Sequence, residues 1–108
     1  MTREEILSEI ERRLREAFGP RYRGAVLYGS EARGEAQPDS DIDVLVLLDG
    51  PMKLEVDMMT AISAIYPLQL EIIKTSDRTI HTMPVDIEEY NTSRFPFFEE
   101  VHKEGVRL

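Results

Sequence analysis

Five consecutive apolar residues, Val44 to Leu48, directly follow the acidic tripeptide Asp41-Ile42-Asp43. An unbroken apolar run, without the alternation of a half-exposed strand, is typical of a β-strand that is covered on both faces. Such a strand needs packed layers above and below it, and helices usually supply them. The run therefore predicts an α/β (α+β) fold, with a strand over 41–48 in a small mixed β-sheet flanked by helices.

Helical spacing of apolar residues marks three other segments. Thr2 and Glu5 stand at capping-box spacing and begin a helix that we expect to end at Gly19-Pro20. A second amphipathic helix is expected from Leu54 to about Tyr66, after a turn that contains proline. A third is expected over 96–104, with the following glycine as its C-cap.

Strand patterns occur before and after the second helix. Residues 25–28 predict a short buried strand that stops at Gly29-Ser30. Over 31–40, the breakers Gly34, Pro38 and Asp39 predict a loop, for which an opening turn of helix is left open. Farther along, 68–73 alternates like a strand, and 79–85 is either another strand or its continuation after a turn. The element order is that of a single α/β domain over residues 1–108.

Charge and composition limit the partners of the chain. The net charge is −8, and the densest group of basic residues is interleaved with acids. Proteins that bind nucleic acid usually carry a basic patch that displaces counterions, so we expect no extended nucleic-acid surface. The chain has no cysteine, no signal-peptide pattern and no unbroken apolar run of membrane-spanning length, which together favour a cytoplasmic location.

The acidic tripeptide has the geometry of a metal site. Side chains at i and i+2 of a strand project to the same face, so Asp41 and Asp43 should lie together at the start of the strand. Two adjacent carboxylates repel each other and need a compensating cation. Mg²⁺ prefers one or two carboxylates together with substrate phosphates. The pair therefore predicts a site for a metal-bound nucleotide.

Gly29-Ser30 lies between the first strand and the loop. Glycine allows close approach of the backbone to a phosphate, to which backbone N–H groups and the Ser30 hydroxyl can donate. Arg33, three residues on, could carry charge toward a triphosphate. Taken alone, Gly-Ser is usually a simple turn, and Asp-x-Asp is more often a solvated pair. The specificity lies in their combination, order and spacing.

That combination resembles a known signature. The polymerase beta-type nucleotidyltransferase superfamily carries Gly-Ser, ten intervening residues and then Asp-x-Asp. Here Gly29-Ser30 is followed by ten residues and then by Asp41-Ile42-Asp43. The fuller string GSEARGEAQPDSDID resembles the minimal nucleotidyltransferase branch, whose small domains are often encoded beside a helical HEPN partner in toxin–antitoxin pairs. The resemblance implies the polymerase beta-like palm fold.

The resemblance also implies an activity. Asp41 and Asp43 would hold Mg²⁺ or Mn²⁺, and nucleoside monophosphate (AMP from ATP) would be transferred with release of pyrophosphate. The acceptor would be a protein, a HEPN-family toxin that the chain silences as its antitoxin. A binding module that neutralises the toxin by contact alone is the alternative, and self-association is left open. The implied nucleotide-binding residues are Gly29, Ser30, Arg33 and Ser40.

A third carboxylate of the family pattern has two possible positions in this chain. The family places it on the strand that follows the second helix. If 68–73 is that strand, Glu71 is the candidate catalytic acid. If 79–85 is the strand instead, Thr79 or His81 falls near the position and no acid does. His81 could then act as a base or a ligand, although a lone histidine on a strand is usually structural.

Overall fold

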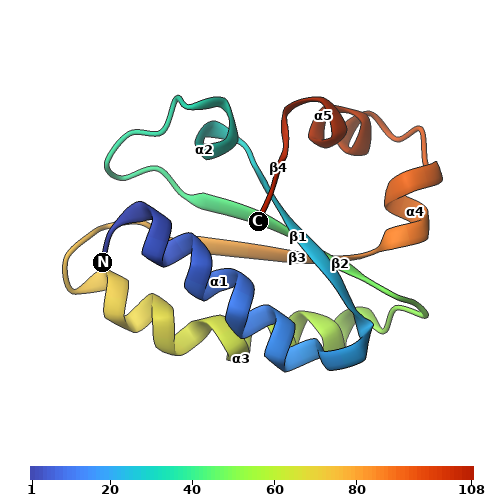
Figure 1. Ribbon diagram of the computed structural model, residues 1–108, viewed down its shortest axis with the longest axis horizontal. Coiled ribbons are helices and arrows are strands. Elements are labelled where there is room, and N and C mark those ends of the chain that lie inside the picture. Colours follow the sequence, from blue (N-terminus) through green and yellow to red (C-terminus); the bar gives the residue numbers. More distant parts are fainter.

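The computed structural model describes all 108 residues, which form a four-stranded sheet with helices on both faces (Figure 1). The strands are β1 (Tyr22–Tyr28), β2 (Ile42–Leu48), β3 (Ile80–Asp86) and β4 (Val106–Arg107), and their order in the sheet is β3-β2-β1-β4. β1 is antiparallel to both β2 and β4, whereas β2 and β3 are parallel. The predicted mixed sheet is therefore confirmed.

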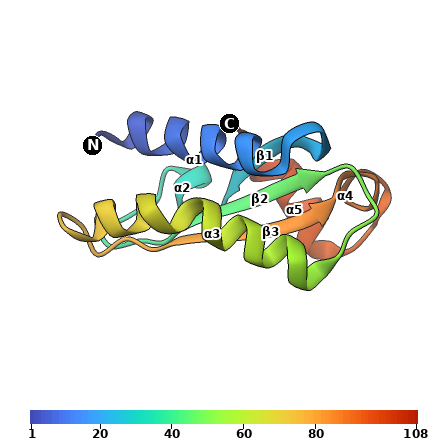
Figure 2. The same ribbon diagram turned by 90° about the horizontal axis from the view of Figure 1, so that it is seen from below.

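The helices divide between the two faces of the sheet. α1 and α3 lie side by side on one face, and α4 and α5 lie on the other (Figures 1 and 2). The short α2 follows the end of β1, where its Ala32 packs against the core that α1 and α3 form. The helix bounds are Arg3–Phe18 for α1, Ser30–Arg33 for α2, Leu54–Ile73 for α3, Ile87–Thr92 for α4 and Pro96–Glu104 for α5.

β2 sits between β1 and β3, and its Val44–Leu48 run is fully buried, as its sequence predicts. Successive side chains of the strand alternate between two cores. Val44 and Val46 join the larger cluster with α1 and α3, while Leu45 and Leu47 join the smaller cluster with α4 and α5. By the same alternation, Asp43 projects to the α4/α5 face.

The predicted strand over 68–73 is wrong, because α3 continues through Pro67 to Ile73. The buried residues of α3 recur at helical spacing through this segment: Asp57, Ala61, Ile65, Leu68 and Ile72. The alternation of apolar residues that indicated a strand is thus the last part of a helical face. The other prediction for this region is confirmed, since β3 covers most of 79–85.

α3 is unusually apolar for a surface helix. It is the only helix long and apolar enough to cross a membrane on length and composition alone, with a mean hydropathy of 1.2. Only 28% of that segment is buried. One face of α3 therefore covers the sheet, and the other presents apolar side chains to solvent.

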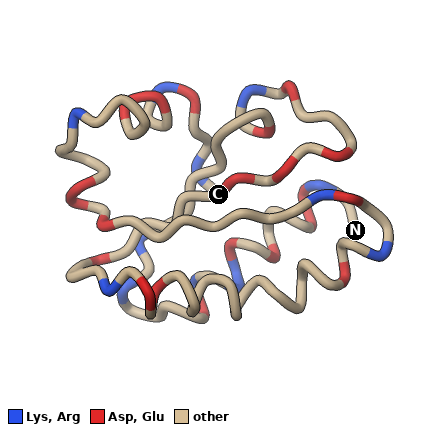
Figure 3. The backbone as a smooth tube through the Cα atoms, turned by 180° about the vertical axis from the view of Figure 1, so that it is seen from behind, with Lys and Arg blue, Asp and Glu red and all other residues tan.

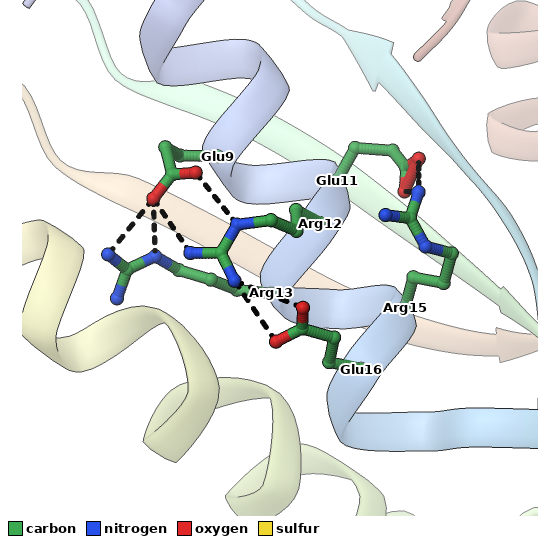
Figure 4. Close-up of polar contacts among 6 residues, drawn as sticks. All are labelled: Glu9, Glu11, Arg12, Arg13, Arg15 and Glu16. Carbon is green, nitrogen blue, oxygen red and sulfur yellow. Dashed lines mark hydrogen bonds and ion pairs between the residues drawn. The ribbon is translucent and has the colours of Figure 1, made fainter.

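The arginines that cluster in the N-terminal part of the sequence are all paired with carboxylates. On α1, Arg12 donates hydrogen bonds to Glu9 and Glu16 (Figure 4). Hydrogen bonds from Arg12 and Arg13 lower the pKa of Glu9 to about 2. The remaining pairs are Arg13–Glu9, Arg15–Glu11, Arg21–Asp57 and Arg23–Asp49. Each positive charge of this group therefore has an acidic neighbour.

Candidate active site

Three chain segments meet at the start of β2. In the sheet register, Asp43 lies opposite Tyr28 of β1 on one side and His81 of β3 on the other. Asp41 immediately precedes β2 and is exposed, and its Oδ2 lies 3.2 Å from Nε2 of His81. The Asp-x-Asp pair thus lies at the start of β2, beside the last residue of β1 and the first residues of β3.

The Asp43 carboxylate is partly buried and electrostatically strained. Burial raises the pKa of Asp43; His81 opposes this effect, and the neighbouring Asp41 adds to it. A carboxylate held among apolar neighbours and beside a like charge is a favourable ligand for a cation, which removes both penalties. The chemistry of this pair fits a divalent metal.

Gly29 brings the Gly-Ser turn into contact with the acidic pair. Its φ of +73° lies in the left-handed region, and a Cβ atom at this position would lie 2.7 Å from Oδ2 of Asp43. Ser30 follows at once as the first residue of α2. The structure therefore places the two halves of the sequence motif side by side, with glycine required at the point of closest approach.

A buried ion cluster fixes both motif halves, and the sequence did not reveal it. Glu31, only 5% exposed, accepts hydrogen bonds from Arg3 of α1 and from Arg78 before β3. Arg78 also donates to the backbone oxygen of Ser40, at 2.7 Å. Burial alone would raise the pKa of Glu31, but the bonds from Arg3 and Arg78 outweigh burial and hold it below its usual range.

The other nucleotide-binding candidates lie around this centre. Arg33 is exposed on α2, and its guanidinium is 3.4 Å from carboxylate oxygens of both Glu35 and Glu104. Such long exposed pairs are weak, so Arg33 can turn toward a phosphate at little cost. The Ser40 hydroxyl accepts a hydrogen bond from the backbone of Gln37 and shapes the loop before the acidic pair.

Glu71 does not take the place of a third carboxylate. It lies in the last turn of α3, exposed, in a hollow lined by residues of the N-terminus. The strand on which this candidate depended is helical, so its geometric basis is wrong. On β3, His81 occupies the position opposite Asp43. No three histidine or acidic side chains of the chain are grouped so that they could jointly hold a metal ion.

Replacement of Gly29 by alanine is expected to damage the site far more than the same change at Gly34. Both glycines have a positive φ. Gly34, with a ψ of 20°, lies in the left-handed helical region, where alanine costs about 1 kcal/mol. Gly29, with a ψ of −154°, lies in a region that essentially only glycine adopts, so the backbone penalty of alanine is larger there. A Cβ at Gly34 meets no atom within 4 Å, whereas one at Gly29 collides with the Asp43 carboxylate.

Thermal unfolding measures the loss of stability in each variant, and titration with Mg²⁺-ATP measures the loss of nucleotide affinity. Gly34→Ala should retain nucleotide affinity, and Gly29→Ala should weaken it by at least about tenfold, or 1.4 kcal/mol. Equal affinity in the two variants would show that close contact between Gly29 and Asp43 is unimportant for binding.

Comparisons with known proteins identify the family of the chain. Residues 7–107 match the family described as "Nucleotidyltransferase domain". "Protein adenylyltransferase MntA" of Thermococcus cleftensis is 36% identical over 75 residues, which are 68% of this chain and 74% of that relative.

Solved structures show the same fold. Spectinomycin adenyltransferase AAD(9) from Enterococcus faecialis, solved with ATP and spectinomycin, matches 99% of this chain and 47% of its own at a TM-score of 0.68 and 20% identity. A toxin–antitoxin structure with AMP-PNP matches 98% of this chain and 72% of that chain, at a TM-score of 0.56 and 17% identity. The chain belongs to the nucleotidyltransferase domain family and is a nucleotidyltransferase.

Proposed function

We propose that this chain acts as a single domain that transfers AMP from ATP to a protein partner, a helical HEPN-family toxin, and so serves as the antitoxin of the pair. The contact between Gly29 and Asp43 carries the proposal, because it joins a phosphate-binding turn to a pair of acidic metal ligands. The name of the Thermococcus relative, a protein adenylyltransferase, supports a protein acceptor. The toxin–antitoxin neighbour with AMP-PNP supports the kind of partner and the nucleotide.

The proposed roles of the residues follow from their positions. Gly29 and Ser30 donate to the β- and γ-phosphates, and Arg33 contributes positive charge beside them. Asp41 and Asp43 would hold Mg²⁺ or Mn²⁺, which would supply positive charge to the reacting phosphate. A pair of carboxylates together with substrate phosphates is a ligand set that Mg²⁺ accepts.

The transfer itself is an in-line displacement at the α-phosphorus. A hydroxyl oxygen of the acceptor forms a bond to this phosphorus, and the bond to the oxygen bridging the α- and β-phosphates breaks. Pyrophosphate leaves with the bonding electrons. His81 would receive the hydroxyl proton; its position in register with Asp43 and beside Asp41 supports this role.

The charge of the chain supports a protein acceptor over a nucleic acid. Its net charge of −8 repels phosphate backbones and attracts a basic, RNA-cleaving partner. The arginines of α1 are already paired with acids and offer no basic track.

Intact-mass spectrometry tests the transfer. The chain is mixed with its HEPN-family partner and Mg²⁺-ATP, and the partner is expected to gain one or more AMP-sized increments. A parallel sample with EDTA should show none, because Asp41 and Asp43 then lack their cation. A partner of unchanged mass in a stable complex would contradict transfer.

One observation favours a second candidate function. His81 lies opposite Asp43 on β3, near the position where the polymerase beta-type pattern has its third carboxylate. A chain with a weakened reaction could still neutralise a basic toxin by contact through its acidic surface. Survival of neutralisation in variants that cannot transfer AMP would support this alternative.

A further inference from the structure

The outer face of α3 is apolar and has no partner in the fold. Seven of the ten large hydrophobic residues that are exposed in the chain belong to this one helix. Five of them form what we call the α3 stripe: Met59, Ile62, Tyr66, Leu70 and Ile73, which are 46–60% exposed. Their intervals of three or four residues place them on one side of the helix, away from the buried face.

The stripe is free of charge along its whole centre. No charged residue occurs from Met58 to Leu70, and in Figure 3 the tube of α3 is tan between its ends. Five half-exposed side chains of this size present on the order of 500 Å² of apolar surface, near the upper end of what monomers expose as one patch. A patch of that size usually marks an interface.

A shallow hollow lies beside the stripe. Its lining includes small side chains, Ala17 of α1 with Thr60, Ser63 and Ala64 of α3, and it has a volume of about 750 Å³. Ile62, Tyr66 and Leu70 form a ridge of side chains four residues apart. Helices commonly pack by setting such a ridge into the groove of another helix.

We propose that the α3 stripe binds a second copy of this chain about a two-fold axis near Tyr66. A two-fold interface requires each contact to occur twice with the roles exchanged. The stripe intervals of 3, 4, 4 and 3 read the same from either end, with Tyr66 at the centre. The two ridges then pack against each other across the axis, with Tyr66 beside its own copy. With Val56 at its margin, the face supplies most of the roughly 800 Å² per partner of a standard interface.

Electrostatics favour a second copy over a basic protein or a membrane. Two chains of net charge −8 repel each other, so they can associate only through a neutral face, and the α3 stripe is neutral. A basic partner would instead select the acidic surfaces elsewhere. Helices that bind membrane surfaces carry Lys and Arg along the apolar face, whereas α3 has lysine only at its two caps, Lys53 and Lys74.

Light scattering coupled to size-exclusion chromatography tests the association with the full chain alone. The wild type is expected to move from the 12.4 kDa monomer to twice that mass as its concentration rises from about 1 μM to about 1 mM. Ile62→Glu/Leu70→Glu should remain monomeric over this range while keeping its helical circular dichroism. Phe95→Glu, which changes an equally exposed apolar residue outside α3, should dimerise like the wild type.

A disulfide experiment tests the axis, since the chain contains no cysteine. Under mild oxidation, Tyr66→Cys should cross-link to its own copy, and Phe95→Cys should not. A wild type that stays monomeric at the highest concentration, or a dimer that survives Ile62→Glu/Leu70→Glu, would overturn the proposal. So would binding of the α3 stripe to the HEPN-family partner in place of a second copy, seen as loss of that complex in the same variant.

Discussion

Replacement of both Asp41 and Asp43 by asparagine is expected to abolish the transfer of AMP, with a loss of at least about a thousandfold in rate. Asparagine keeps the size of each side chain and removes the charge that would hold the cation against the triphosphate. The change is read as the AMP increment on the partner after incubation with Mg²⁺-ATP. Asp39→Asn is the matched control, because Asp39 is an exposed acid of the same loop and should leave the rate unchanged.

The same double variant should fold at least as well as the wild type. Burial and the neighbouring Asp41 both disfavour the charged form of Asp43, so a neutral residue relieves a penalty in the metal-free protein. A melting temperature equal to or above that of the wild type is therefore expected, as is common when a functional site is neutralised. The melting temperature and the affinity for the partner are measured on the same samples, so that a loss of transfer caused by misfolding is recognised. A melting temperature below that of the wild type would contradict this prediction.

This variant also separates the two candidate functions. If it binds the partner with wild-type affinity but no longer suppresses its toxicity, neutralisation requires the reaction. If suppression persists with no AMP on the partner, contact is sufficient, and the proposed antitoxin mechanism is wrong in its chemical step.

Replacement of Arg78 by alanine is expected to lower the free energy of unfolding by about 3 kcal/mol, which for a chain of this size is roughly 15 °C in Tm. The change leaves Glu31 buried with only the half-exposed Arg3 as a partner, and it removes the bond to the Ser40 backbone. Urea denaturation measures the effect. Arg23→Ala, which removes one arginine from an exposed pair with Asp49, should cost about 0.5 kcal/mol or less.

The stability difference between Arg78→Ala and the wild type should depend on pH. The pKa of Glu31 is lowered in the folded chain, so its ionised form stabilises the fold at pH above the ordinary carboxyl value of 4.5. The contribution is lost as pH falls through the folded pKa. The difference in the free energy of unfolding between the two proteins is therefore expected to be largest at neutral pH and to decrease below pH 4.5. A gap that is constant from pH 7 to pH 3 would assign the loss to packing and not to the ion pair.

The sequence predicted those parts of the fold that rest on local pattern. The capping box at Thr2 and Glu5, the buried strand at Val44–Leu48 and the helix over 96–104 all occur as expected. These features depend on neighbours within a few residues, so spacing alone reveals them. The wrong prediction for Leu68–Ile73 has the same origin, because a short alternating run also fits a helical face. Proline usually ends a helix, yet Pro67 lies inside α3.

The parts that the sequence did not predict depend on contacts between distant residues. Arg78 and Glu31 are 47 positions apart, and nothing in the local pattern of either pairs them. The short strand β4, only Val106–Arg107, exists because β1 offers an open edge for it. The roles of Asp41, Asp43, Gly29, Ser30, Arg33 and Ser40 remain predictions, to be tested by the variants described above.

Because β2 and β3 are parallel, we expect the site to form late in folding. A parallel pair has to be joined by a long crossover, here through the whole of α3, so its contacts form only after a large loop has closed. His81 reaches Asp41, and Arg78 reaches the backbone of Ser40, only once that closure is complete. ATP would then bind the finished fold and not its precursors, and at a hundred times its Kd it would add about 2.7 kcal/mol to global stability. In a cell, the lifetime of this protein would accordingly follow the supply of its own substrate.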